Sequence, residues 1–129
     1  MIDVMKKIDE IGELYKEGKF EKCVQEVELF WSSLPEPKEN IKNSYLLIEY
    51  GARICLVLKD YNSAMDWALK SLKYIDIRNK MGESEFLIGM VAFEMNDLEK
   101  AKEYFLIAKK KSGGRAFIGE DPRYKNLIK

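Results

Sequence analysis

The chain has 129 residues, of which 47% are hydrophobic and 34% charged, a balance that fits one folded domain and excludes a disordered chain. Its 22 basic and 22 acidic residues cancel, so the net charge provides no general attraction to nucleic acid or to an anionic membrane. No run of about 20 apolar residues and no signal-peptide pattern occurs, so we expect a cytoplasmic protein without a membrane segment.

Two helices are predicted in the first part of the chain, over Ile2–Glu17 and Phe20–Leu34. Apolar residues recur in both at spacings of three and four, the period of an amphipathic helix. Gly18 separates them and can adopt the left-handed conformation of a helix end. Pro35 and Pro37 end the second helix, because proline lacks an amide donor and disfavours helix in the preceding residue.

The second pair is predicted over Lys38–Leu58 and Tyr61–Ile75. The run Ile54–Leu58 is apolar nearly all round, which indicates a helix packed on several sides. Asp60 can accept hydrogen bonds from the first turn of the next helix. Cys55 falls inside the apolar pattern here, as Cys23 does in the first pair, so we expect both to be core residues.

The third pair is predicted over Asn79–Met95 and Leu98–Lys111. Asn96 is the expected turn, and Asp97 the cap of the following helix. Glycines 113 and 114 stop that helix, and Asp121 followed by Pro122 predicts a short terminal helix.

The three turn-plus-helix segments align with one another, which indicates an internal repeat. Each has an aromatic residue or leucine, two polar residues and then a small residue. The small residues are 41 and 37 positions apart, at Cys23, Ala64 and Ala101.

This pattern resembles the tetratricopeptide repeat family, whose period is about 34 residues. The third pair matches best, with residues at the family's small, small, aromatic and small positions: Gly89, Ala101, Phe105 and Ala108. The second pair keeps Ala52 and Ala64 but has Ala68 where an aromatic is usual. The resemblance implies an all-α fold in which three antiparallel helix pairs (residues 1–35, 38–76 and 79–111) stack as a superhelix. Residues 112–129 then form a tail and a short capping helix, in a single domain spanning residues 1–129.

Residues suited to catalysis are scarce. The chain contains no histidine, the commonest general base and metal ligand. The acid pairs Glu83 with Glu85 and Glu120 with Asp121 are interpreted as ordinary carboxylates on solvated helix faces. We therefore expect no enzyme, no metal and no cofactor.

The resemblance also implies a partner-binding groove lined by the first helix of each pair. In this sequence the groove positions of the family correspond to Ile8, Tyr15, Glu49, Arg53, Phe86, Met90, Phe93 and Glu94. Aromatic and arginine side chains are typical anchors of protein interfaces. The alternative is that Phe86, Met90 and Phe93 belong to the core. Glu49 and Glu94 would favour a basic partner.

The C-terminal segment KSGGRAFIGEDPRYKNLIK is similar to the endings of small bacterial tetratricopeptide-like immunity proteins encoded beside secreted toxins. The resemblance implies a non-catalytic protein that binds and neutralises a cognate toxin with a basic surface. The alternative for the segment is structural: Phe117, Ile118, Tyr124 and Leu127 would cover the last helix. A general adaptor or assembly chaperone is the alternative function. A third alternative is an RNA-binding or enzymatic role for Lys109–Arg115. The structural interpretation of these lysines is that they complement the negative end of a helix dipole.

Overall fold

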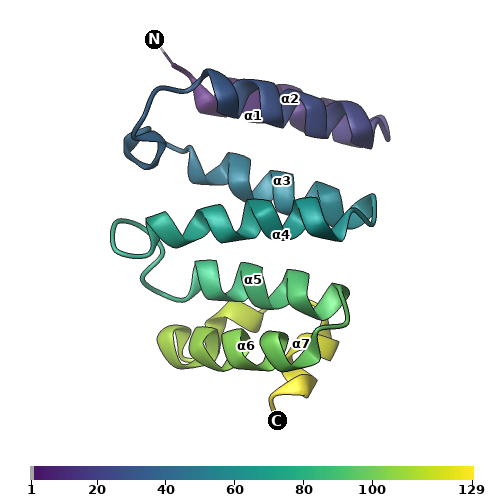
Figure 1. Cartoon of the computed structure of the whole chain (residues 1–129), viewed down its shortest axis with the longest axis vertical. Helices are drawn as coiled ribbons and strands as arrows, with labels where there is room; N and C mark the ends of the chain where they lie inside the picture. Colours follow the sequence, from purple (N-terminus) through teal and green to yellow (C-terminus); the bar gives the residue numbers. More distant parts are fainter. Residues whose placement is uncertain (1) are drawn as a thin grey trace. The chain divides into compact units, whose positions relative to one another are not determined.

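The computed structural model describes residues 2–129, and every regular element in that range is a helix (Figure 1). The predicted all-α class is therefore confirmed. The chain divides into two compact units, unit 1 (Met1–Trp67) and unit 2 (Ala68–Lys129). Their boundary falls within the fourth helix, and the stacking of three pairs into one domain stays a prediction. None of the helices in residues 2–129 has the length and apolar character needed to span a bilayer.

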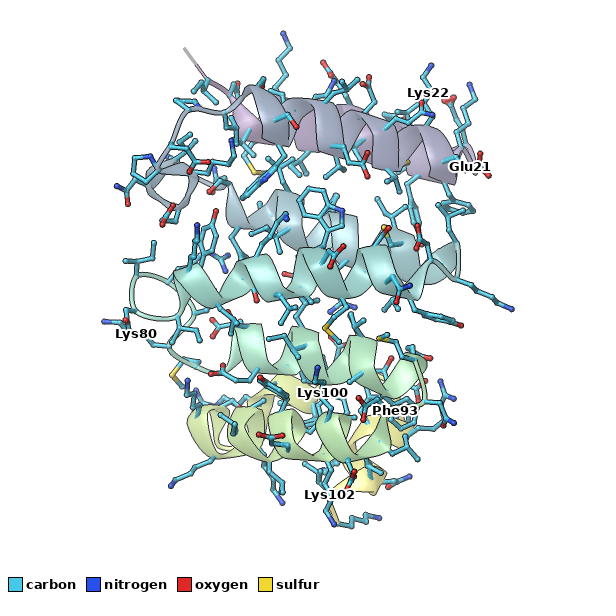
Figure 2. The ribbon with its side chains drawn as sticks, viewed as in Figure 1. Glu21, Lys22, Lys80, Phe93, Lys100 and Lys102 are labelled. Atoms are coloured by element: carbon cyan, nitrogen blue, oxygen red, sulfur yellow. The ribbon has the colours of Figure 1, made fainter. Side chains whose placement is uncertain are left out.

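Unit 1 begins with the helix pair α1 (Val4–Lys16) and α2 (Phe20–Ser33). The Asp3 carboxylate caps α1 by accepting from the amide of Lys6 at 3.1 Å. Glu21 and Lys22 lie exposed on the first turn of α2 (Figure 2). The short 3₁₀ helix η1 (Lys38–Asn40) follows, and then α3 (Tyr45–Val57) and α4 (Tyr61–Lys70).

Each helix pair turns at one residue in the left-handed conformation. The backbone φ is 76° at Gly18, 60° at Lys59 and 66° at Asn96. The next amide in each turn donates to the carbonyl oxygen five residues earlier, from Lys19 to Leu14, Asp60 to Cys55 and Asp97 to Ala92. This closure ends a helix and satisfies its last carbonyls. The turns recur at the spacings of the small residues, so the three-fold helix–turn–helix repetition predicted from the sequence is present.

The third helix begins later than the expected Lys38. Asn43 has a φ of 68°, which interrupts helical hydrogen bonding, and α3 starts only at Tyr45. The fourth helix ends earlier than expected. Its α-helical part stops at Lys70 and continues to Tyr74 only as the 3₁₀ helix η2 (Ser71–Tyr74).

Unit 2 contains η2, the pair α5 (Glu83–Glu94) and α6 (Leu98–Ser112), the 3₁₀ helix η3 (Arg115–Phe117) and α7 (Pro122–Leu127). The fifth helix was expected from Asn79 but begins at Glu83, because Gly82 has a φ of 90°. A Cβ on Gly82 would lie 2.9 Å from the backbone of Ala108, so no larger residue fits there. The terminal helix is confirmed: the Asp121 carboxylate caps it by accepting from the amide of Arg123 at 2.9 Å.

Each unit contains one helix pair held close by a glycine lying against an aromatic ring. In unit 1, a Cβ on Gly51 of α3 would approach the ring of Trp67 on α4 to 2.6 Å. In unit 2, a Cβ on Gly89 of α5 would approach the ring of Phe105 on α6 to 2.6 Å. Gly89 and Phe105, which stand at small and aromatic positions of the family pattern, thus meet in the third pair. In the second pair the contact joins Gly51 and Trp67, each one position before Ala52 and Ala68 of that pattern.

The two cysteines are core residues, as predicted. Cys23 and Cys55 are buried in unit 1, and the Sγ of Cys23 donates to the carbonyl oxygen of Ile11 at 3.6 Å. Burial, together with the charges of Asp60 and Glu28, raises the pKa of Cys55 to about 11. This thiol is therefore protonated and weakly reactive at neutral pH.

Candidate partner-binding site

Unit 1 contains a pocket of about 350 Å³ lined by residues of α1 and α3. The α1 residues are Ile11, Gly12, Tyr15 and Lys16, and the α3 residues are Tyr50, Arg53 and Ile54. Ile11 and Ile54 are buried, whereas Tyr15 is 47% exposed. The lining therefore combines buried aliphatic residues with an exposed aromatic ring.

Two of the predicted partner residues, Tyr15 and Arg53, meet at this pocket. The ring of Tyr15 also packs edge-on against Phe20, with centroids 5.1 Å apart. Arg53 donates from Nε to the Oε1 of Glu49 at 3.3 Å, which places a third predicted residue beside the pocket. Ile8 is buried and belongs to the core of unit 1.

The charges that line the pocket are positive. Lys16 and Arg53 are the charged residues of the lining, and no carboxylate belongs to it among the residues that the structure describes. The neighbouring acids Glu49 and Glu13 each form an ion pair with one of these cations, at 3.3 and 3.4 Å. The pocket thus differs from the acidic groove expected from the sequence, in which Glu49 was to attract a basic partner.

Gly12 lies in the interior of α1 and lines the pocket. A Cβ added there would meet no heavy atom within 4 Å, its chain neighbours and the backbone of its own helix aside. Gly51 and Gly89 are also inside helices, but each faces an aromatic ring of its own unit. Gly12 therefore leaves open the kind of space that a ring fills in the other two cases.

The predicted partner residues of unit 2 are covered by the chain itself. Phe86 and Met90 of α5 are buried, which fits the alternative that they are core residues. Phe93 is half-buried, and the ring of Tyr124 lies edge-on to it at 5.1 Å. The guanidinium of Arg123 lies 5.2 Å from the Phe93 ring centroid.

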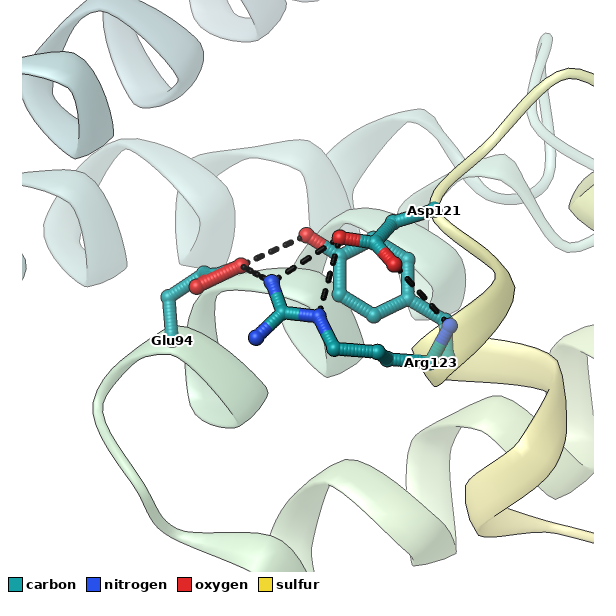
Figure 3. Close-up of polar contacts among 4 residues, drawn as sticks. Glu94, Asp121 and Arg123 are labelled. Atoms are coloured by element: carbon teal, nitrogen blue, oxygen red, sulfur yellow. Dashed lines mark hydrogen bonds and ion pairs between the residues drawn. The ribbon is translucent and has the colours of Figure 1, made fainter.

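Glu94, the fourth of these residues, is engaged by the same segment. Its Oε1 accepts from the hydroxyl of Tyr124 at 2.9 Å and from Arg123 at 3.4 Å, and Arg123 also donates to Asp121 (Figure 3). Burial, followed by the hydrogen bond to Glu94, raises the pKa of Tyr124 well above 10.0. The hydrogen bonds from Arg123 lower the pKa of Asp121. Helix α7 therefore occupies the α5 face that the sequence assigned to a partner.

The structural alternative for the C-terminal segment holds for two of its four apolar residues. Phe117 and Tyr124 pack on Phe105 of α6, with ring centroids 5.4 and 5.3 Å away. Ile118 is an exception, because it is 78% exposed.

One expectation about a charged residue needs correction. Glu85 was placed on a solvated face, but it is only 5% exposed and forms an ion pair with Lys111. Lys111 thus pairs with a buried carboxylate in addition to lying in the last turn of α6. Asp121 caps α7, as its place directly before Pro122 predicted.

The sequence interpretation did not assign five of the pocket-lining residues to a partner site: Ile11, Gly12, Lys16, Tyr50 and Ile54. A glycine in the middle of a helical pattern was the available signal, because it weakens a helix and usually has a packing or functional reason. In residues 2–129 no group of three or more cysteine or acidic side chains is placed to hold a metal ion.

No known family model, curated protein or solved structure matches this chain. The resemblance to tetratricopeptide repeats stays an expectation drawn from the residues themselves.

Proposed function

We propose that the chain is a non-catalytic protein-interaction module that binds a partner protein at the α1–α3 pocket of unit 1. The observation that carries the proposal is Gly12, a glycine in the interior of a helix with open space against it.

Glycine in a helix interior costs about 0.5–1 kcal/mol relative to alanine. At Gly51 and Gly89 this cost has a structural reason, because a Cβ would collide with a ring. At Gly12 an alanine would fit without collision. The missing Cβ at Gly12 leaves the pocket wider than alanine would, which suits a binding protein.

The composition of the pocket suits a protein partner. An aromatic residue and an arginine, Tyr15 and Arg53, stand at an apolar cavity, and such residues dominate the energy of protein interfaces. A cavity of about 350 Å³ is at the small end of ligand-binding pockets. It is therefore suited to one anchoring side chain of a partner.

The specific form that we propose is an immunity protein that sequesters a cognate bacterial toxin in the cytoplasm. Its support is the resemblance of the C-terminal segment to the endings of such proteins. A general adaptor or assembly chaperone is the second candidate, favoured by the small size of the pocket, which suits a short peptide. The two differ in affinity: an immunity complex should be nanomolar, whereas an adaptor should bind several partners at about micromolar Kd.

The test is co-expression of the chain with the product of the adjacent gene, followed by purification through a tag on one of them. A stoichiometric complex that protects cells from the toxicity of the neighbour supports the immunity function. If the neighbour is not toxic and forms no complex, the immunity function is wrong. Peptide-array binding of the full chain then tests the adaptor function.

A further inference from the structure

We infer that the α1–α3 pocket receives an aromatic side chain of the partner with a carboxylate close to it in sequence. This rests on the proposed function, because it names the chemistry of the segment that the same pocket binds.

The aromatic anchor is inferred from the two other helical glycines of the chain. Trp67 fills the space at Gly51, and Phe105 fills the space at Gly89. Without a Cβ, a ring can approach the helix backbone closely, and in both cases the chain uses it in this way. Gly12 offers a similar backbone surface inside the pocket, with no ring of the described chain against it.

The other lining residues favour a ring as well. Tyr15 and Tyr50 of the lining provide aromatic partners, with which a guest ring would form edge-to-face pairs. Ile11 and Ile54 are the buried aliphatic residues of the lining. A flat apolar group can therefore contact an aliphatic surface and two rings at once.

The carboxylate is inferred from charge complementarity. Lys16 and Arg53 line the pocket, and the carboxylates that pair with them, Glu13 and Glu49, lie outside the lining. The Lys16–Glu13 pair is largely exposed, and exposed pairs contribute little to stability. A partner carboxylate beside the anchor can therefore bind Lys16 without a large cost, and Arg53 adds a second positive charge to the lining.

The experiment uses three acetylated and amidated pentapeptides titrated into the ¹⁵N-labelled full chain at low salt. Their sequences are Gly-Asp-Phe-Glu-Gly, Gly-Lys-Phe-Lys-Gly and Gly-Asp-Ala-Glu-Gly. We expect the acidic phenylalanine peptide to shift the amide signals of Gly12, Tyr15 and Arg53 saturably. Its Kd should be at least about fivefold lower than that of the basic peptide. The alanine peptide should produce no saturable shift.

Two variants locate the charge effect. Arg53→Gln should weaken binding of the acidic peptide about twofold to fivefold and leave the basic peptide unchanged or tighter. Lys22→Gln is the matched control, because Lys22 is exposed on α2 and does not line the pocket (Figure 2). Its Kd for each peptide should equal that of the original chain.

If the basic peptide binds as tightly as the acidic phenylalanine peptide or more tightly, the inferred partner carboxylate is wrong. If the alanine peptide binds as tightly as the acidic phenylalanine peptide, the inferred aromatic anchor is wrong. Either result leaves a protein-binding pocket in place. Shifts at the pocket that grow with chain concentration alone would overturn the inference in favour of a second copy of the chain. If no peptide perturbs the pocket, the inference is wrong, and co-purification with a partner still tests the proposed function separately.

Discussion

Residues of α5 in unit 2 and of α1 and α3 in unit 1 were expected to bind a partner, but those of α5 are covered, whereas Tyr15 and Arg53 line an open pocket. On α5, the ring of Phe93 and the carboxylate of Glu94 are contacted by α7 of the same chain. In the pocket, Tyr15 is exposed and Gly12 faces open space. A helix pair must bury its apolar face against something. Residues that the family pattern assigns to one groove can thus be covered by the chain in one unit and line an open pocket in the other.

The largest effect is expected at the centre of the covered region. Phe105 is fully buried and packs against Gly89, Phe86 and Tyr124. Phe105→Ala should therefore lower the free energy of unfolding by about 3–5 kcal/mol, measured by urea denaturation. Ile107→Ala, at a partly exposed position of the same helix, is the control and should cost less than about 1 kcal/mol. Similar losses for both variants would show that Phe105 is not a core residue.

The next largest loss of stability is expected at Tyr124, where two substitutions distinguish the contribution of the ring from that of the hydroxyl. Tyr124→Ala removes ring contacts with Phe93, Phe86 and Phe105, and we expect it to cost about 2–4 kcal/mol. Tyr124→Phe keeps the ring and removes only the hydrogen bond to Glu94, so it should cost about 1 kcal/mol. Chemical denaturation of both variants gives the comparison. Equal losses would mean that the hydroxyl rather than the ring holds α7 in place.

Alkaline pH should weaken the covered region through the same residue. The pKa of Tyr124 is raised in the folded chain, so folding favours the neutral phenol. Its contribution to stability is complete below pH 10 and is lost as the pH rises above that value, where the unfolded chain releases the proton first. Unfolding free energies measured from pH 8 to pH 11 should fall less steeply for Tyr124→Phe than for the original chain. Identical slopes would contradict this assignment.

The smallest expected changes in stability come from replacing helical glycines with alanine. Their sign should differ between glycines that lie against a ring and Gly12, which faces open space. Gly51→Ala and Gly89→Ala should destabilise by about 1–3 kcal/mol, because each new Cβ would lie 2.6 Å from a ring carbon. Gly12→Ala should instead stabilise by about 0.5–1 kcal/mol, because the space is open and alanine is the better helix former. Thermal unfolding of the three variants tests this difference. Destabilisation by Gly12→Ala would mean that the position is packed.

The helices could be predicted because their apolar spacing and turn residues are local signals. Their boundaries at Tyr45 and Glu83 could not, because they depend on the left-handed conformations of Asn43 and Gly82. Asparagine in this conformation is one of several options that a sequence allows. The packing of Gly82 on Ala108 is set by a residue 26 positions away.

The candidate site was predictable only in part. Tyr15 and Arg53 follow from the family resemblance, and the structure brings them to one pocket. Phe93 and Glu94 follow from the same argument, yet α7 covers them, since helical periodicity does not tell which apolar face a later segment will cover. Gly12 was missed because a sequence records a glycine without recording what faces it.

The most direct test of the account is partner binding by a chain whose pocket is filled from within. Gly12→Leu places a side chain in the open space at Gly12, and Lys22→Gln, at an exposed position of α2 outside the pocket lining, is the control. Calorimetric titration with the co-purified partner should show at least about 100-fold weaker binding by Gly12→Leu, with Lys22→Gln unchanged and both variants fully folded. Binding by folded Gly12→Leu at the affinity of the original chain would show that the pocket is not where the partner binds.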